Sequence, residues 1–167
     1  MTTRVRSTLL RLTLALFTTL FVHSAYAEMQ ISDLEAGLFT RPHLKLKEGE
    51  RLLVGGSKET VEATKQFNAE LGTKFGIRFN VSGKSLNKPN VVTMLYLTPG
   101  IIEKDGSRHD KYTVTKDLDV SASSHDMAFQ ITENYEQVPG IWEFMVFADD
   151  KLLARKSFEL LPAVKSK

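Results

Sequence analysis

The feature of this sequence that most restricts its fold is the alternation of apolar and polar residues in several short segments. The clearest is 75–82, where Phe75, Ile77, Phe79 and Val81 alternate with Gly, Arg, Asn and Ser. In an extended chain a period of two places successive side chains on opposite faces, so one face is buried and the other is not. This pattern predicts a half-buried β-strand.

The same reading predicts four further strands in the chain. They cover residues 31–40, 91–98, 112–120 and 127–132. Residues 91–98 are apolar on both faces, which suits a central strand, and Pro99-Gly100 is expected to end it as a turn. The segment 112–120 is interpreted as one longer, interrupted strand with Leu118 and Val120 on its apolar face. We expect 31–40, which contains a Gly, to lie at a sheet edge.

Turn signals separate these segments and indicate the fold class. They are Gly55-Gly56, Ser82-Gly83, Lys88-Pro89-Asn90, Pro99-Gly100, Asp105-Gly106 and Pro139-Gly140. Several short strands with turns between them predict an all-β sandwich or barrel. Residues 57–71 allow two readings: a helix capped by Ser57 and ended by Gly72, or a strand and loop favoured by their Thr, Val and Phe residues. We prefer the strand and loop.

The segment 139–161 contains the only Trp and predicts a β-hairpin. A three-residue loop, Asp149-Asp150-Lys151, would pair Val146 with Ala154, Phe144 with Lys156 and Trp142 with Phe158, so the large apolar groups face one another. Lys156 is then expected at a bulge, or with its charge extended into water. This register makes Trp142 a core residue; the alternative is a surface Trp in a carbohydrate or peptide groove.

The first 27 residues have the pattern of a secretory signal peptide. Arg4, Arg6 and Arg11 precede an apolar stretch, 12–22, and Ala25-Tyr26-Ala27 supplies the small residues of a cleavage site. We expect cleavage between Ala27 and Glu28. The alternative is a short N-terminal membrane anchor, although the apolar stretch is shorter than a membrane-spanning helix.

Composition excludes several classes of protein for the mature chain, which is predicted to be a single domain, 28–167. The chain has 22 Lys and Arg against 20 Asp and Glu; removing the signal takes away three Arg and no acid, which leaves 19 basic and 20 acidic residues. A near-neutral chain without a basic stripe argues against nucleic-acid binding. There is no Cys, so the chain is neither a disulfide-stapled scaffold nor a lipoprotein. No later apolar run approaches the length of a transmembrane helix.

Two His-Asp pairs are the residues most suited to chemistry. His109-Asp110 and His125-Asp126 each follow a Ser-containing turn, and His with carboxylate is a ligand set for zinc or similar ions. A strand is predicted between the two pairs, which would place them at opposite ends of the sheet, unless a bent connection brings them together. Solvated loop residues are the favoured interpretation.

No other motif predicts a catalytic, cofactor or metal site. Gly83-Lys84-Ser85 lacks the upstream glycine of a phosphate-binding loop. No Gly-x-Ser-x-Gly and no dinucleotide fingerprint occur. We therefore assign no catalytic, cofactor-binding or metal-ligating residue and expect the protein not to be an enzyme.

Four motifs together resemble a known family. They are Gly37-Leu38-Phe39, Gly72 to Ile77, Pro139-Gly140-Ile141-Trp142 and Phe158. The sequence over about 30–161 resembles small uncharacterised proteobacterial secreted proteins that carry a domain of unknown function. The resemblance implies an immunoglobulin-like antiparallel β-sandwich, of about seven to nine strands here, and a periplasmic location. It supplies no activity and no site residue.

These observations predict a non-catalytic periplasmic binding or interaction module. Its partner is expected to be an unidentified envelope protein, with no nucleic acid and no stable membrane anchor after signal cleavage. Strand 31–40 is the candidate edge that would accept a partner strand. The alternative is a carrier of a small ligand or metal, using the loops around His109 and His125. A hydrolase without a recognisable motif is the third hypothesis.

Overall fold

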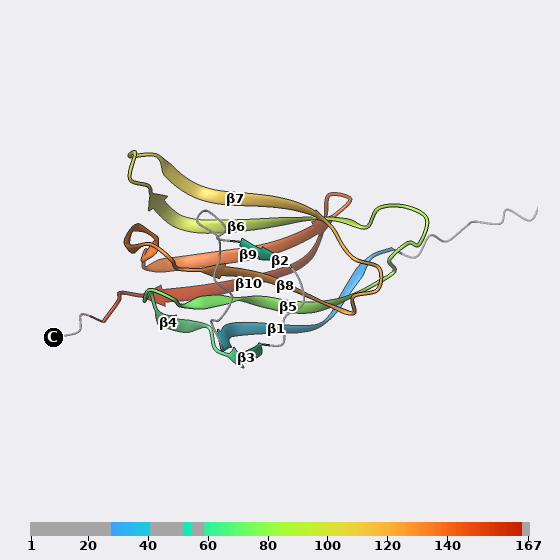
Figure 1. The fold of residues 1–167 in the computed structure, drawn as a ribbon, viewed down its shortest axis with the longest axis horizontal. Coiled ribbons are helices and arrows are strands. Elements are labelled where there is room, and N and C mark those ends of the chain that lie inside the picture. The colour runs from blue at the N-terminus through green and yellow to red at the C-terminus, as the bar shows by residue number, and fades with distance from the viewer. Residues whose placement is uncertain (1–27, 41–51, 55–58, 165–167) are drawn as a thin grey trace, which may run out of the picture.

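The computed structural model describes residues 28–40, 52–54 and 59–164, so the predicted signal peptide, 1–27, lies outside the described residues. The described chain forms ten strands in two five-stranded sheets (Figure 1). The strands are β1 (Gln30–Thr40), β2 (Leu52–Val54), β3 (Thr60–Ala63), β4 (Gln66–Asn68), β5 (Lys74–Ser82), β6 (Val91–Ile102), β7 (Arg108–Asp117), β8 (Ser124–Gln130), β9 (Gly140–Ala148) and β10 (Lys151–Leu161), with a 3-10 helix η1 (Asn134–Glu136) before β9. No helix in this part of the chain is long and apolar enough to cross a membrane.

The two sheets pack face to face as a β-sandwich. Sheet I has the order β2-β8-β5-β1-β3 and sheet II the order β4-β10-β9-β6-β7. Paired strands are antiparallel except β4 and β10, which are parallel. The all-β sandwich prediction is confirmed. Three strands of three or four residues, β2, β3 and β4, bring the total above the predicted seven to nine, because segments so short have no alternation to detect.

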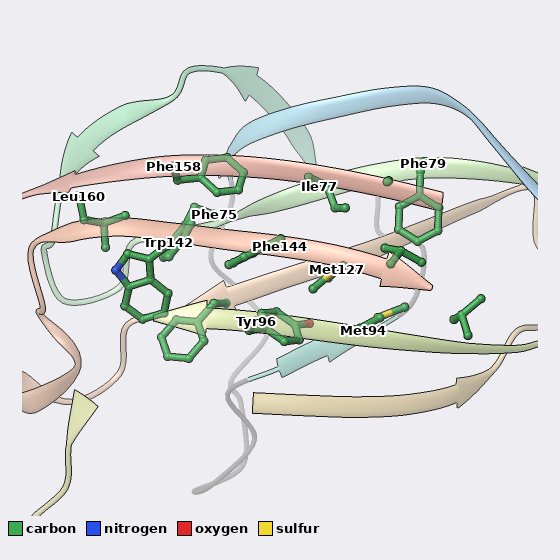
Figure 2. Packing of buried hydrophobic residues seen from close by; sticks show 14 of the residues in the cluster. Phe75, Ile77, Phe79, Met94, Tyr96, Met127, Trp142, Phe144, Phe158 and Leu160 are labelled. Carbon is green, nitrogen blue, oxygen red and sulfur yellow. The ribbon is translucent and has the colours of Figure 1, made fainter. Parts of the chain in front are cut away.

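Aromatic rings from both sheets fill the core (Figure 2). Phe75 on sheet I is central: its ring centroid lies 5.4 Å from that of Trp142, 5.4 Å from Phe144 and 5.5 Å from Phe158, all on sheet II. The two edge-to-face contacts, with Trp142 and Phe158, are favoured arrangements for aromatic pairs. The alternation that predicted β5 therefore marks the face that closes the sandwich.

Trp142 is a core residue, as predicted, and the alternative of a surface groove is wrong. Its side chain has no exposed area. Its indole Nε1 donates a hydrogen bond to the carbonyl of Val138, at 3.1 Å. The polar atom of the largest buried side chain is therefore satisfied by the segment that leads into β9, as burial of an indole requires.

The β9–β10 hairpin has the predicted register but a different loop. Ala154 pairs with Val146, Lys156 with Phe144 and Phe158 with Trp142. The loop has two residues, Asp149 and Asp150, both at positive φ (47° and 62°), which is the type I′ geometry that suits the twist of a hairpin. The register then shifts between Leu152 and Ala154. The extra residue therefore sits in a bulge of β10 at Leu153 and not in the turn.

The prediction that Pro99-Gly100 ends a strand is wrong. β6 continues to Ile102, with a register shift against β7 between Leu97 and Ile101. Gly100 has φ +110°, and a Cβ there would lie 2.1 Å from the guanidinium of Arg108. The Pro-Gly signal thus marks a bulge inside a strand.

Two further strand predictions are corrected by the pairing. β7 ends at Asp117, so Leu118 and Val120 lie beyond it; Leu118 is buried and Val120 is exposed. β1 is not an edge strand along its length, because β5 pairs with one side and β3 with Gly37–Thr40 on the other. Within the described residues only the first half of β1 lacks a second neighbour.

Residues 59–71 form two short strands and loops, β3 and β4, which confirms the preference for strand over helix. Both strands lie at sheet edges. Ser57, the predicted helix cap, lies outside the described residues.

Candidate functional site

The sequence predicted that His125 and Asp126 are solvated loop residues, and this prediction is wrong. Both are in β8, which begins at Ser124, and only 3% and 2% of their surfaces are exposed. His125 pairs with Phe79 across the sheet, and its ring lies 6.1 Å from the Phe79 ring. The strand predicted from Met127 onward begins three residues earlier in the structure. The Ser, His and Asp at the start of β8 are all polar, so they do not show the alternation of apolar and polar residues on which the prediction rests.

Asp126 belongs to a buried charge cluster, Glu59, Lys74, Arg78 and Asp126, on the outer face of sheet I. Arg78 makes a two-pronged contact with Asp126, at 2.7 and 3.1 Å, and also donates to the carbonyl of Glu59. Lys74 is paired with the Glu59 carboxylate. Hydrogen bonding to Asp126 raises the pKa of Arg78 above its usual value.

The ring of Phe39 completes this cluster. The Lys74 ammonium lies 5.0 Å and the Arg78 guanidinium 5.4 Å from the ring centroid, within the range of a cation–π interaction. Every charge is matched by a partner from another segment. This arrangement attaches Glu59 to the sheet; it is a structural network rather than a reactive one.

Burial lowers the pKa of His125, and the charge of Lys84 lowers it further. Its Nε2 atom is buried without a hydrogen-bond partner in the described part of the protein. Lys84 itself donates to the carbonyls of Asp119 and Ala122. The Gly-Lys-Ser segment, 83–85, is therefore a loop whose Lys holds the neighbouring loop after β7.

His109 lies at the start of β7, near Ser107 and Glu103, but this group is not a catalytic triad. The Ser107 hydroxyl is 3.1 Å from Nε2 of His109, and a Glu103 oxygen is 3.7 Å from the same Nε2. In a triad the Ser and the acid contact different ring nitrogens, so that the base takes a proton on one side while the acid orients the other. Here both groups approach one nitrogen, so the relay is absent.

The two His-Asp pairs do not come together. β7 belongs to sheet II and β8 to sheet I, and the rest of β7, from Asp110 to Asp117, separates His109 from the loop before His125. Among the described residues no group of three His, Cys, Asp or Glu side chains is placed to hold a metal ion. The described residues therefore offer no set of metal ligands that would support the metal-carrier alternative.

A concavity lies on the outer face of sheet II. It is a hollow of about 530 Å³, whose floor is formed by Thr93, Leu95 and Phe147 of adjacent strands β6 and β9. These three side chains are half-buried, and Val91 beside them is 40% exposed. Two of these floor side chains, Leu95 and Phe147, are apolar and partly open to solvent, which is one feature of binding surfaces. We call this feature the sheet II hollow.

Charged and polar residues form the rim of the sheet II hollow. Lys111 and Thr113 come from β7, and Asp149 and Asp150 from the tip of the β9–β10 hairpin. The type I′ turn holds both aspartates at exposed positions. The rim therefore carries two negative charges at the hairpin tip and one positive charge on β7.

A second hollow, of about 290 Å³, shares Val91 and Asp149 with the first. Glu28 and Met29 line it, and Glu28 is paired with Lys151 at 2.8 Å. A Cβ at Gly83 would lie 2.2 Å from the carbonyl of Glu28, so the chain at Glu28 packs closely on the body of the domain. The concave surface thus extends to the start of the described chain.

One sequence pattern, the apolar residues on both faces of 91–98, corresponds to this surface. Residues 91–98 are apolar on both faces, which predicted a central strand. β6 is a central strand, between β9 and β7. Its second apolar face, Val91, Leu95 and Leu97, is exposed or half-buried, however, because the described chain does not cover it.

Comparison with solved structures identifies a similar fold. An immunoglobulin-like protein from Pseudomonas aeruginosa has a TM-score of 0.67 and 39% sequence identity, over 82% of this chain and 99% of that chain. Alkylpurine DNA glycosylase AlkC from Pseudomonas fluorescens, bound to DNA containing an abasic site analog, has a TM-score of 0.42 and 15% identity, over 80% of this chain and 30% of that chain. The second likeness is too weak to support an argument about function. No curated protein matches the sequence.

The fold is therefore immunoglobulin-like, in agreement with the resemblance in the sequence. The model of one protein family matches residues 27–160, which include all ten strands except the end of β10. The chain belongs to the family described as Domain of unknown function (DUF3859).

Proposed function

We propose that this protein is a non-catalytic binding module of the periplasm and that it holds an envelope protein on the sheet II hollow. The observation that carries this proposal is the hollow itself, with an apolar floor of Leu95 and Phe147 beneath a charged rim. Covering exposed apolar groups with a partner removes apolar surface from water, which lowers the free energy.

The rim indicates the chemistry of the bound segment. Asp149 and Asp150 favour a cationic side chain at one end of the hollow, and Lys111 favours an acidic or carbonyl group at the β7 side. The floor favours an aliphatic or aromatic side chain between them. The proposed ligand is therefore an apolar protein segment with a basic residue beside it.

The periplasmic location in this proposal rests on the signal pattern of residues 1–27 and on the family resemblance. Osmotic-shock fractionation of cells expressing the full chain tests it, together with N-terminal sequencing of the released product. We expect a periplasmic product that begins at Glu28. Retention of the uncleaved chain in the membrane fraction would support the short-anchor alternative.

Binding is tested with an envelope extract and a matched pair of variants. Leu95→Glu places a charge in the floor, and Ile141→Glu places the same charge on the same outer face, outside the hollow, where Ile141 is 57% exposed. The proposal expects saturable retention of one envelope protein by the wild type and by Ile141→Glu, and its loss with Leu95→Glu. Equal retention by all three proteins would exclude the hollow as the site. Circular dichroism spectra of both variants are compared with the wild type to check that they fold.

A further inference from the structure

The long strand β7 is an edge strand of sheet II, and it differs from the other edges. In the described part of the chain, the other terminal strands, β2, β3 and β4, have three or four residues, whereas β7 has ten. The open half of β1 is interrupted by a register shift between Ser32 and Glu35, where Asp33 has φ 49°. Short or bulged edges resist pairing with another strand, whereas a long regular edge permits it. β7 lies along one margin of the molecule (Figure 1).

The direction of the free backbone groups on β7 follows from its pairing with β6. Residues Lys111–Asp117 pair without interruption with Leu97–Val91, and the Leu118 amide donates to the carbonyl of Asn90. In an antiparallel ladder the N–H and C=O of one residue point to the same side, and successive residues alternate. Tyr112 and Val114 therefore direct these groups to β6. Lys111, Thr113 and Thr115 direct theirs to the open edge.

The charges on this edge complement a second copy of the same strand. Asp110-Lys111 stands at one end and Lys116-Asp117 at the other, so Asp110 and Lys116 are six residues apart. An even separation places them on the same face of the strand. An antiparallel copy centred on Thr113 then brings each Asp110 opposite Lys116 of the second copy. The two strands attract each other at both ends.

The uncharged pairs of this register are also favourable. Tyr112 lies opposite Val114 of the second copy, an aromatic and β-branched pair of two half-buried side chains, and Thr113 lies opposite itself. A register centred on Tyr112 would instead place Arg108 opposite Lys116. One centred on Val114 would place Tyr112 opposite Lys116. The register centred on Thr113 therefore combines the charge pairs with the apolar pairs.

We propose that two copies of this protein associate through antiparallel pairing of their β7 strands, which joins the two copies of sheet II into one continuous sheet. The interface is isologous, since the same strand contributes from both sides of a twofold axis at Thr113. The Arg108–Asp110 ion pair within each copy, at 2.8 Å, lies at the end of this seam. The proposal does not rest on the sheet II hollow, although Lys111 and Thr113 of β7 belong both to the rim of that hollow and to this edge.

The first test is the oligomeric state of the mature protein by analytical ultracentrifugation over a range of concentrations. The wild type is expected to form a reversible dimer. Thr113→Pro removes an N–H that points to the open edge, so it should abolish the dimer while the monomer keeps its circular dichroism and melting temperature. Thr113→Ala, which keeps the N–H, should dimerise. A wild type that is monomeric throughout, or a Thr113→Pro variant that still dimerises, would overturn the proposal.

Charge reversal tests the register. Lys116→Asp places an acid opposite Asp110 of the second copy and should weaken the dimer by about tenfold or more, equivalent to about 1.4 kcal/mol. The double variant D110K/K116D restores opposite charges and should recover the dimer. No recovery would exclude this register.

Hydrogen exchange provides a readout that does not depend on a variant. The amides of Lys111, Thr113 and Thr115 should become protected as the protein concentration rises, whereas those of Tyr112 and Val114 should be protected at every concentration. Concentration-independent exchange at all five amides would contradict the pairing.

Discussion

The outer faces of the two sheets differ in a way that reverses the usual relation between polarity and burial. On sheet I the outer face carries the charges of Lys74, Arg78 and Asp126, yet Lys74 is only 4% exposed and Asp126 only 2% exposed. On sheet II the outer face carries Val91 and Leu95, yet Val91 is 40% exposed and Leu95 is half-buried. The charged cluster on sheet I is covered, and the apolar patch on sheet II is open.

The difference follows from what lies over each face. Glu59 lies over sheet I, where its carboxylate contacts Lys74 and its carbonyl accepts a hydrogen bond from Arg78. The charges are therefore buried because they bind another segment of the same chain. On sheet II no described segment covers the floor of the hollow. A face that folding leaves open and apolar is available for a partner.

The largest effect is expected when the sheet I cluster loses one charge. Glu59→Ala leaves the Lys74 ammonium buried without its carboxylate, which should lower the free energy of unfolding by about 3 to 5 kcal/mol. The double variant K74M/E59A removes both charges and should recover much of this loss. Urea unfolding monitored by Trp142 fluorescence measures both variants. Equal stability of the two variants would show that the buried charge is not the cause.

A smaller loss is expected from Gly76→Ala, on the same outer face. A Cβ at Gly76 would lie 2.2 Å from the carbonyl oxygen of Met127 on the neighbouring strand, and the cost of such overpacking is about 1 to 3 kcal/mol. Gly106→Ala is the control, because Gly106 also has positive φ but has nothing within 4 Å of the Cβ position. Urea midpoints should fall further for Gly76→Ala than for Gly106→Ala. The opposite order would mean that backbone conformation, and not the contact, restricts position 76.

Stability should also fall as the solution becomes mildly acidic, because of His125. Burial holds its pKa in the folded protein below the value of about 6.5 expected in the unfolded chain. Below pH 6.5 or so the unfolded chain binds a proton that the folded protein does not, so stability is full above that pH and declines as pH falls toward the folded pKa. Thermal melts of the wild type and of His125→Phe across this range measure the contribution. We expect the variant to lose part of the pH dependence.

The smallest effect on stability is expected on the open face. Leu95→Thr removes apolar surface that is already half-exposed, so the free energy of unfolding should change by less than about 1 kcal/mol. The same variant should weaken partner binding, because the floor of the hollow becomes polar. A stability loss as large as that of Glu59→Ala would mean that Leu95 belongs to the core and not to an open surface.

The predictable features of this fold are those encoded over a few residues. Alternation identified β5, and the requirement that large apolar groups meet identified the pairing of Trp142 with Phe158. The loop of the same hairpin was predicted less well. A three-residue loop and a two-residue loop followed by a bulge produce the same pairs beyond Ala154, so the pattern of side chains does not distinguish them.

The candidate site was less predictable than the fold. The apolar outer face of residues 91–98 was visible, but exposure depends on whether another segment lies above it. The burial of Asp126 was not visible, because its partner Arg78 is 48 residues away in the sequence. The residue types of the two His-Asp pairs are those of metal ligands, but the structure places the pairs on different sheets.

By itself the sequence determined that this chain is a β-sandwich with an aromatic core, because strand period, turn chemistry and hairpin register are local properties. Only the tertiary structure decided which outer face is covered, that β1 is paired on both sides over part of its length, and that β7 is the long open edge. These outcomes depend on contacts between segments far apart in the chain. Whether a face is buried depends on how the sheets assemble. The alternation of residues within one strand does not predict which other segment of the chain covers its outer face.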